Sequence, residues 1–276
     1  MSLAFVGASR ESYTDAVQRL EQAAGGLNAG ELARAAEDLF GVAALLHTEG
    51  SLRRAFSDAS LPSAAKIQLA GSLLGQRLST PAMNVVHGLI TSRWSRSRDL
   101  VDAIDTLGVI AQLAAAERDG HLDEVEDELF RFARILEGEP ELLVALQDVT
   151  LPAAPRVELL TQVLSGKVQD ATLRLAREAV ANPRGRSLDR ALEDYVRLAA
   201  ERRQRLVAEV WSAIPLTSEQ TDNLTAALAR IYERDIQLQV IVDPKLMGGL
   251  TVRVGEEVIE GSVLHRLVIA RRRVAG

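Results

Sequence analysis

The side chains that could perform catalysis are scattered along this sequence and match no spacing that a known reaction uses. The four histidines, His47, His87, His121 and His265, have no partner at a metal-ligand spacing, so a structural or surface role is expected for each. The absence of cysteine excludes disulfides, thiolate metal sites and a cysteine nucleophile. The chain also lacks the G-x-x-x-x-G-K-S/T phosphate loop, the H-E-x-x-H zinc motif and the dinucleotide glycine fingerprint. The sequence therefore predicts no catalytic site, no metal site and no cofactor.

Three charged clusters could bind a ligand, but each has a simpler interpretation. The acidic run 123–128 is expected to favour a helix N-terminus and to stay solvated, because a calcium loop needs glycine and spaced oxygen ligands. Arg93, Arg96 and Arg98 could bind phosphate, although a solvated loop or a contact with an acidic partner is the preferred interpretation. Arg271–Arg273 suits a helix C-terminus.

The composition is that of a globular protein with little affinity for nucleic acid. Of 276 residues, 47% are hydrophobic and 25% charged, as in ordinary globular domains. The net charge of −6 and the 4% of aromatic residues disfavour nucleic-acid binding, because they provide neither a basic field nor stacking platforms. No apolar run reaches the ~20 residues that cross a bilayer, and Met1–Arg10 does not resemble a signal peptide. A soluble intracellular protein is expected.

The elements that must position any functional surface begin with helices. Apolar residues recur at helical spacing near 12–24, 28–46, 49–57, 62–77, 80–90 and 99–118. Asn28 is expected to cap the second helix, and Pro62 fits the first position of the fourth. These segments predict a first helical bundle over residues 1–118.

The same pattern then repeats 90 residues later. Asp38-Leu39-Phe40 is echoed by Glu128-Leu129-Phe130, and the Leu-Pro pair that ends 58–62 recurs at the end of 148–152. An ungapped comparison of 37–99 with 127–189 gives 16 identities in 63 positions, at one constant offset. We interpret this as an internal duplication, because ordinary solenoid repeats are shorter, about 20–50 residues.

The second copy predicts helices near 121–137, 140–147, 152–165, 170–181 and 187–205. Its first helix is expected to be the late part of the 99–118 helix, so that two bundles, 1–118 and 119–205, share one continuous helix. The predicted fold class is mainly α, with two tandem helical bundles followed by a small α/β C-terminal domain over 206–276.

The C-terminal domain is predicted where the apolar period changes from helical to two. A strand at 206–213 and a helix starting at Thr217 precede two further strands, 237–242 and 250–254, which we expect to pair as a hairpin. Gly248-Gly249 between them indicates a backbone with positive φ. A final helix is expected from Ser262, with Val263, Leu264, Leu267 and Val268 facing inward.

The stretch 241–263 resembles the C-terminal signature of the delta subunit of bacterial F-type ATP synthases, the family of the mitochondrial oligomycin-sensitivity-conferring protein. The matching elements are Asp243, the turn 246–249, the strand 251–255 and the closing segment Ile259-Glu260-Gly261-Ser262. An ordinary β-hairpin with a glycine turn would carry the same residues, but the order of the other elements favours the family. The second copy resembles the single bundle of the family best, and the first copy is the main departure.

The resemblance implies a non-catalytic adaptor in the peripheral stalk, or stator, of a rotary ATP synthase. Its helical part would bind the N-terminal helices of alpha subunits, and its C-terminal domain the C-terminal end of a b-type stalk subunit, so that rotor torque drives ATP synthesis. The expected alpha-binding residues are Tyr13, Ala16, Val17, Leu20, Met83, Val86, Leu89, Ile90, Leu173, Ala176 and Val180, although the same stripes also suit plain core packing. The expected stalk-binding residues are Leu246, Met247, Gly248, Gly249, Leu264, Leu267 and Val268.

A second interpretation remains open from the sequence. An all-helical scaffold or an RNA-associated interaction protein would share the helical composition, although the negative charge and the α/β tail disfavour it. The resemblance implies a peripheral location at the cytoplasmic face of the bacterial membrane, through the ATP synthase complex, with no nucleic-acid partner, no cofactor and no direct membrane insertion.

Overall fold

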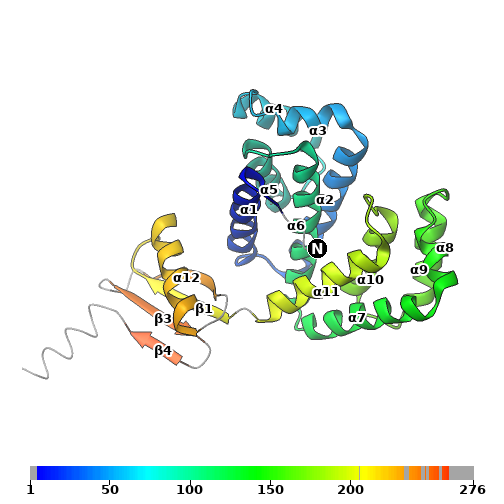
Figure 1. Ribbon diagram of the computed structural model, residues 1–276. Coiled ribbons are helices and arrows are strands. Elements are labelled where there is room, and N and C mark those ends of the chain that lie inside the picture. Colours follow the sequence, from blue (N-terminus) through cyan, green and yellow to red (C-terminus); the bar gives the residue numbers. More distant parts are fainter. Residues whose placement is uncertain are drawn as a thin grey trace, which may run out of the picture. The chain divides into compact units, whose positions relative to one another are not determined.

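The computed structural model describes residues 5–204, 206–232, 236–243, 246, 249–254 and 257–260. The chain divides into two compact units, residues 1–203 and 204–276, and each is considered by itself (Figure 1). The final helix predicted from Ser262, including Val263, lies outside the described residues.

The first unit is built from helices α1 to α11, and its helices run close to their predicted ranges. The first copy contributes α1 (Ala8–Ala24), α2 (Ala29–Thr48), α3 (Gly50–Ser57), α4 (Ser63–Leu74), α5 (Thr80–Thr91) and α6 (Ser97–Arg118). The second copy contributes α7 (Leu122–Gly138), α8 (Pro140–Gln147), α9 (Ala153–Leu164), α10 (Asp170–Ala181) and α11 (Leu188–Gln204). This confirms the mainly α fold class.

Local capping explains where several helices begin. Asn28 accepts a hydrogen bond from the Glu31 backbone while the Glu31 carboxylate accepts one from the Asn28 backbone, a complete capping box that confirms the predicted cap. Pro62 was predicted at the first position of the fourth helix. In the structure α4 begins at Ser63, and Pro62 is its N-cap residue. Proline suits this place because it has no backbone N–H to leave unpaired.

Helix α6 lies at the centre of the first unit. From Asp99 to Ala116 every residue except Asp102 is buried, which is unusual for an ordinary amphipathic helix. It packs against α1, α2, α3 and α5 of the first copy and against α7 and α10 of the second. Gly108 allows the closest approach, because a Cβ there would lie 2.6 Å from the Phe40 ring. The helix therefore belongs to both copies.

The duplication is visible in individual hydrogen bonds. The Ser79 backbone N–H before α5 donates to Asp38 at 2.7 Å, and the Gln169 backbone N–H before α10 donates to Glu128 at 2.9 Å. The turns before α4 and α9 also match, since Asp58 and Asp148 each accept bonds from the backbone and hydroxyl two residues later. Equivalent residues thus fold in equivalent ways in the two copies.

The second unit is a small α/β fold. It contains β1 (Leu206–Ser212), α12 (Ser218–Tyr232), β2 (Ile236–Val242), β3 (Leu250–Val254) and β4 (Glu257–Glu260), in the sheet order β2-β1-β3-β4. Strands β1 and β2 are parallel, and α12 is the crossover that such a pair requires. The core gathers Ala208, Val210, Leu228, Ile236, Val252 and Val254.

The predicted hairpin between 237–242 and 250–254 is wrong. Strands β2 and β3 are not neighbours, because β1 lies between them, parallel to β2 and antiparallel to β3. Ala208 and Val210 of β1 are fully buried, so this strand gains most from the central position. The second antiparallel partner of β3 is β4, which the sequence analysis did not predict.

Gly249, just before β3, has φ 84°, as predicted for this turn. Replacing it by valine should destabilise the second unit by about 1–3 kcal/mol, because a β-branched residue is strained at positive φ. Hydrogen exchange at the β3 amides would report the loss, and Gly249→Asn, which tolerates this conformation, should cost less. Equal protection in the glycine and valine proteins would contradict the prediction.

Candidate partner-binding surfaces

The residues predicted to bind a partner on α1 divide into core and surface. Ala16 and Leu20 are buried between α1 and its neighbours, whereas Tyr13 and Val17 are half-buried. The Tyr13 ring lies 4.7 Å from the ring of Phe5, which restrains its position. Only the half-buried pair offers area to a partner in this conformation.

The predicted residues on α5 and α10 behave in the same way. Met83 and Leu173, which are equivalent in the two copies, are half-buried. The remaining members of the prediction, Val86, Leu89, Ile90, Ala176 and Val180, are buried in the core. They serve plain packing here because α5 and α10 each press one apolar stripe against the rest of the unit. The surface residues of the prediction reduce to Tyr13, Val17, Met83 and Leu173.

A channel follows α2, α6 and α10, which we call the α2–α6–α10 channel. It consists of two adjoining grooves of about 310 and 390 Å³, and both are lined by Gln112 and Arg174. Small or apolar residues line part of its walls, namely Ala29, Gly30, Ala33, Phe40, Gly41 and Ala44 of α2, Ala115 and Ala116 of α6, Val157 of α9, and Ala171 and Ala181 of α10. Polar and charged residues line the rest, among them Glu37, Asp119, His121, Asp170, Arg177 and Glu178. Small walls of this kind allow a helix to approach closely.

Gln112 lies where the two grooves meet. The residue is only 2% exposed, and its carbonyl oxygen Oε1 has no hydrogen-bond partner within the described part of the chain. Burying an amide oxygen without a partner costs about 1–3 kcal/mol. An ion pair between Arg174 and Glu37, at 3.7 Å, links α10 to α2 beside it. The sequence analysis missed Gln112, although one polar residue inside the apolar run 107–116 was a signal that could have found it.

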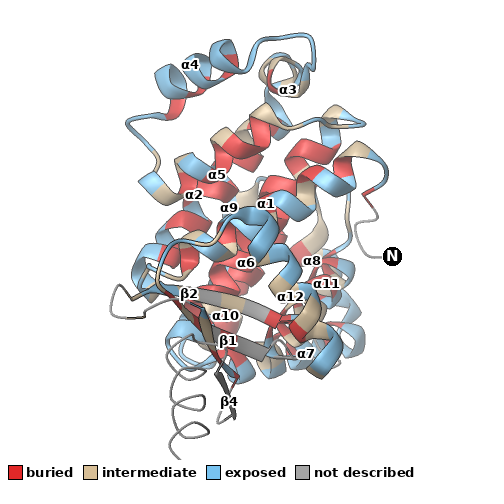
Figure 2. Cartoon of the chain, turned by 90° about the vertical axis from the view of Figure 1, so that its left-hand side faces the viewer, coloured by how far each residue is buried: buried red, intermediate tan, exposed pale blue. Residues whose placement is uncertain are grey.

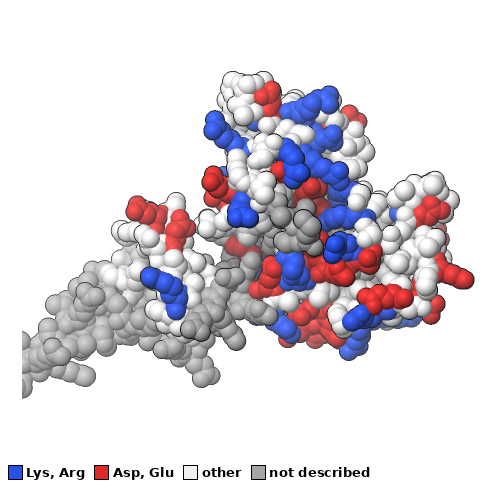
Figure 3. Space-filling model, in the orientation of Figure 1, with Lys and Arg blue, Asp and Glu red and all other residues white. Residues whose placement is uncertain are grey.

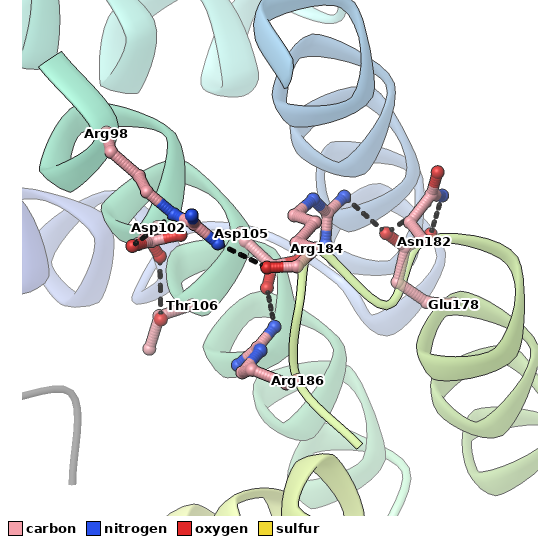
Figure 4. A network of polar contacts seen from close by, with 8 residues as sticks. All are labelled: Arg98, Asp102, Asp105, Thr106, Glu178, Asn182, Arg184 and Arg186. Atoms are coloured by element: carbon pink, nitrogen blue, oxygen red, sulfur yellow. Dashed lines mark hydrogen bonds and ion pairs between the residues drawn. The ribbon is translucent and has the colours of Figure 1, made fainter. Parts of the chain in front are cut away.

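A buried ionic network fixes one wall of the channel (Figure 4). The Asp105 carboxylate on α6 accepts hydrogen bonds from Arg184 and Arg186, which lie in the turn between α10 and α11. Arg184 also donates to Glu178 of α10 at 2.6 Å, and Arg98 of α6 donates to the Arg184 carbonyl. The network ties α10 and its following turn to the shared helix.

Burial sets the direction of the pKa shift for two carboxylates in and beside this network, Asp102 and Glu178. It raises the pKa of Asp102, an effect that Arg98 and Arg186 oppose. It also raises the pKa of Glu178, against the attraction of Arg184. The Arg184 side chain is 2% exposed and that of Asp105 1%, so neither charge has water to replace its partner. Such a cluster is held together because each charge would be costly alone.

The predicted stalk-binding residues lie in or beyond the second unit's sheet. Leu246 is half-buried, and Gly249 is exposed. Met247, Gly248, Leu264, Leu267 and Val268 lie outside the described residues.

Neither a metal cluster nor a membrane span is found in the part of the chain that the structure describes. No group of three or more His, Cys, Asp or Glu side chains there is placed to hold a metal ion. No helix in the same part is both long and apolar enough to cross a bilayer.

Comparison with known proteins relates these units to one family. The family model of the ATP synthase delta (OSCP) subunit matches residues 109–273, which begin inside α6 and cover the second copy and the second unit. The ATP synthase delta subunits of Streptomyces avermitilis, Streptomyces griseus and Frankia alni are 48%, 46% and 47% identical to this chain. Each alignment covers at least 96% of this chain and 98% of the relative.

The family match and the alignments with the relatives cover different parts of the chain. Residues 1–108, which hold most of the first copy, lie outside the family match, yet the relatives share them. The first copy is therefore an addition to the family's common part that these relatives also carry. With both results in hand, the chain belongs to the ATP synthase delta (OSCP) subunit family, whose members are structural rather than catalytic subunits of the F-type ATP synthase peripheral stalk.

Proposed function

We propose that this chain links the catalytic head of an F-type ATP synthase to its stalk. Its first unit binds the N-terminal helices of alpha subunits, and its second unit binds the C-terminal end of a b-type subunit. The adaptor keeps the head from turning with the rotor, so that torque drives ATP synthesis. The observation that carries the proposal is the α2–α6–α10 channel, two adjoining grooves partly lined by small residues, with one unpartnered amide oxygen where they meet.

The channel suits an amphipathic helix. An apolar stripe at i, i+3, i+4 and i+7 would lie against the small residues of α2 and α10. A hydrogen-bond donor on the same helix would pair with the Gln112 Oε1 and remove the cost of leaving that oxygen unbonded, about 1–3 kcal/mol. Arg177 is exposed on the channel wall and has no ion pair among the described residues, so it can hold an acidic side chain of the incoming helix.

A second alpha site is proposed on the first copy. There Tyr13 and Val17 of α1 and Met83 of α5 are half-buried, and α1 packs against α5. A chain with two such sites holds two alpha helices and gains avidity if both are reached at once. The proposed boundaries are residues 1–118 and 119–205 for the copies and 206–276 for the stalk-binding domain.

The proposed location follows from these partners. The protein sits at the cytoplasmic face of the cell membrane as a peripheral part of the complex, without inserting into the bilayer. The stalk contact involves the region around Leu246 and Gly249 of the second unit. Neither a nucleic acid nor a cofactor takes part.

Filling the channel tests the proposal. Gly41 lies on the channel wall, and a Cβ built there meets nothing within 4 Å, so Gly41→Leu should fold normally. Its side chain would occupy the groove and should weaken binding of a synthetic alpha N-terminal peptide at least tenfold, as measured by isothermal titration calorimetry. The matched control is Gly138→Leu at the end of α7, which also meets nothing within 4 Å. Unchanged affinity in Gly41→Leu would refute the channel as the alpha site.

A further inference from the structure

Helices α4 and α9 occupy the same place in the two copies but are covered to different degrees. On α9, Val157, Leu159 and Val163 are half-buried and pack against the core. The equivalent residues of α4, Ile67, Leu69 and Leu73, are 38%, 36% and 45% exposed. The turns before the two helices do not differ in this way, because Leu61 is 40% exposed and its counterpart Leu151 is 48% exposed. Ile67, Leu69 and Leu73 are thus more exposed than their counterparts on α9, and most of α4 is coloured as exposed in Figure 2.

The charge around α4 has also diverged from that around α9. Residues 50–78, which include α3, α4 and the turn after α4, contain four Lys and Arg and a single acidic residue, Asp58, whereas the equivalent 140–168 contain two Lys and Arg and three acidic residues. Arg54 on α3 and Arg77 just beyond α4 are exposed, and neither forms an ion pair with any described residue. Figure 3 shows Lys and Arg side chains gathered over the part of the unit where α3, α4 and α5 lie. In a chain of net charge −6, this local excess of positive charge indicates an acidic partner.

One buried cation on α4 lacks the contacts of its counterpart. Arg156 of α9 donates to the carbonyls of Leu146 and Val180, at 3.2 and 2.7 Å, and so anchors α9. Lys66 of α4 is only 4% exposed, and its side chain makes no hydrogen bond within the described part of the chain. Burial lowers its pKa, and Asp58 is the nearby charge that opposes this. A carboxylate brought to this face would strengthen the support that Lys66 now receives from Asp58 alone.

We propose that α4 and the turn before it bind an acidic amphipathic helix of a partner protein. Leu69 and Leu73 lie one helical turn apart, about 6 Å along the axis, which matches the i, i+4 stripe of a bound helix. Acidic residues beside that stripe would face Arg54 and Arg77. This site goes beyond the proposed function, because it lies apart from the α2–α6–α10 channel and its partner has a defined charge.

An anionic membrane is a poorer match for the same face. A helix that binds a bilayer surface carries Lys and Arg along its polar side. The exposed positions of α4 between its two apolar edges are Ala64, Ala65, Gln68, Gly71 and Ser72, and the one charged residue of the helix is the buried Lys66. A protein helix therefore fits better than a membrane.

The test uses the full-length chain and two labelled synthetic helices, each of about 18 residues or five helical turns. Both carry the same leucine stripe, with glutamate at the flanking positions in one and lysine in the other. The glutamate helix should bind, and salt should weaken the binding because the flanking contacts are exposed charge pairs. Both Leu69→Asn/Leu73→Asn and Arg54→Glu/Arg77→Glu should lower its affinity at least tenfold.

Matched controls separate binding at this site from nonspecific hydrophobic binding. Phe130 and Ile135 on α7 are also exposed, at 49% and 51%, so Phe130→Asn/Ile135→Asn should leave the affinity unchanged. The proposal would be overturned if the lysine helix bound as tightly as the glutamate helix. It would also be overturned if neither the leucine double variant nor the arginine double variant lowered the affinity for the glutamate helix. Binding to vesicles of anionic lipid without binding of the glutamate helix would assign the face to a membrane. Self-association that Leu69→Asn/Leu73→Asn abolishes, seen by sedimentation, would assign it to a second copy of the chain.

Discussion

Asp105→Asn should lower the free energy of unfolding of the first unit by about 3–5 kcal/mol, the cost of breaking a buried ion pair by removing one partner. Asparagine keeps the shape of the side chain, so the loss comes from charge rather than from packing. It leaves the Arg184 guanidinium, whose side chain is 2% exposed, with Glu178 as its remaining carboxylate, and removes the carboxylate that pairs with Arg186. The wall of the channel formed by α10 should loosen at the same time.

Urea unfolding followed by circular dichroism at pH 7 measures this effect. The matched control is Asp15→Asn, because Asp15 stands 90 residues before Asp105, is exposed and forms no ion pair with a described residue. Its substitution should change stability by less than about 0.5 kcal/mol, as for an ordinary surface site. Similar midpoints for the two variants would show that the network contributes little.

Removing one whole repeat should convert the chain into an adaptor with a single alpha site. Deleting residues 25–114 removes 90 residues and joins Ala24 to Ala115, so the helical register of α1 continues into the end of α6. Asp15 then takes the place of Asp105, and Gln22 the place of Gln112. Because each position keeps the same residue type, the ionic network can form again, and the shortened chain should fold.

The shortened chain should bind the catalytic head roughly 10²–10⁴-fold more weakly than the full chain, the gain that a second linked site can provide. Calorimetric titration with an alpha N-terminal peptide should give two sites on the full chain and one on the shortened chain. Circular dichroism and urea unfolding would establish that the shortened chain is folded. One site on both chains, with equal affinity for the head, would leave the first copy without a role in binding alpha subunits.

Local features of the fold could be predicted from the sequence because each depends on neighbours along the chain. Asn28 and Glu31 form a capping box three residues apart, and Thr217 with Gln220 forms another before α12. The positive φ of Gly249 and the starts of α5 and α10 follow from similarly short-range preferences. The 90-residue repeat was also readable, because duplication preserves local patterns in both copies.

The functional surfaces depend on contacts between residues far apart in the chain. Asp105 meets Arg184 across 79 positions, and the channel joins α2 to α10, so no periodicity could reveal either. The apolar stripes of α1, α5 and α10 predicted binding residues, yet most of those residues are core, because a stripe that faces a partner and one that faces the interior have the same period.

The sequence by itself determined the helices, their caps, the repeat and the family resemblance, which local propensity and the chain order specify. The tertiary structure decided which apolar residues remain accessible, that β1 separates β2 from β3, and that α4 is open where α9 is covered. Burial is a property of three-dimensional packing, and equivalent residues in two copies can receive different neighbours. That is why Leu69 and Leu159, identical in type and position within their repeats, face different surroundings.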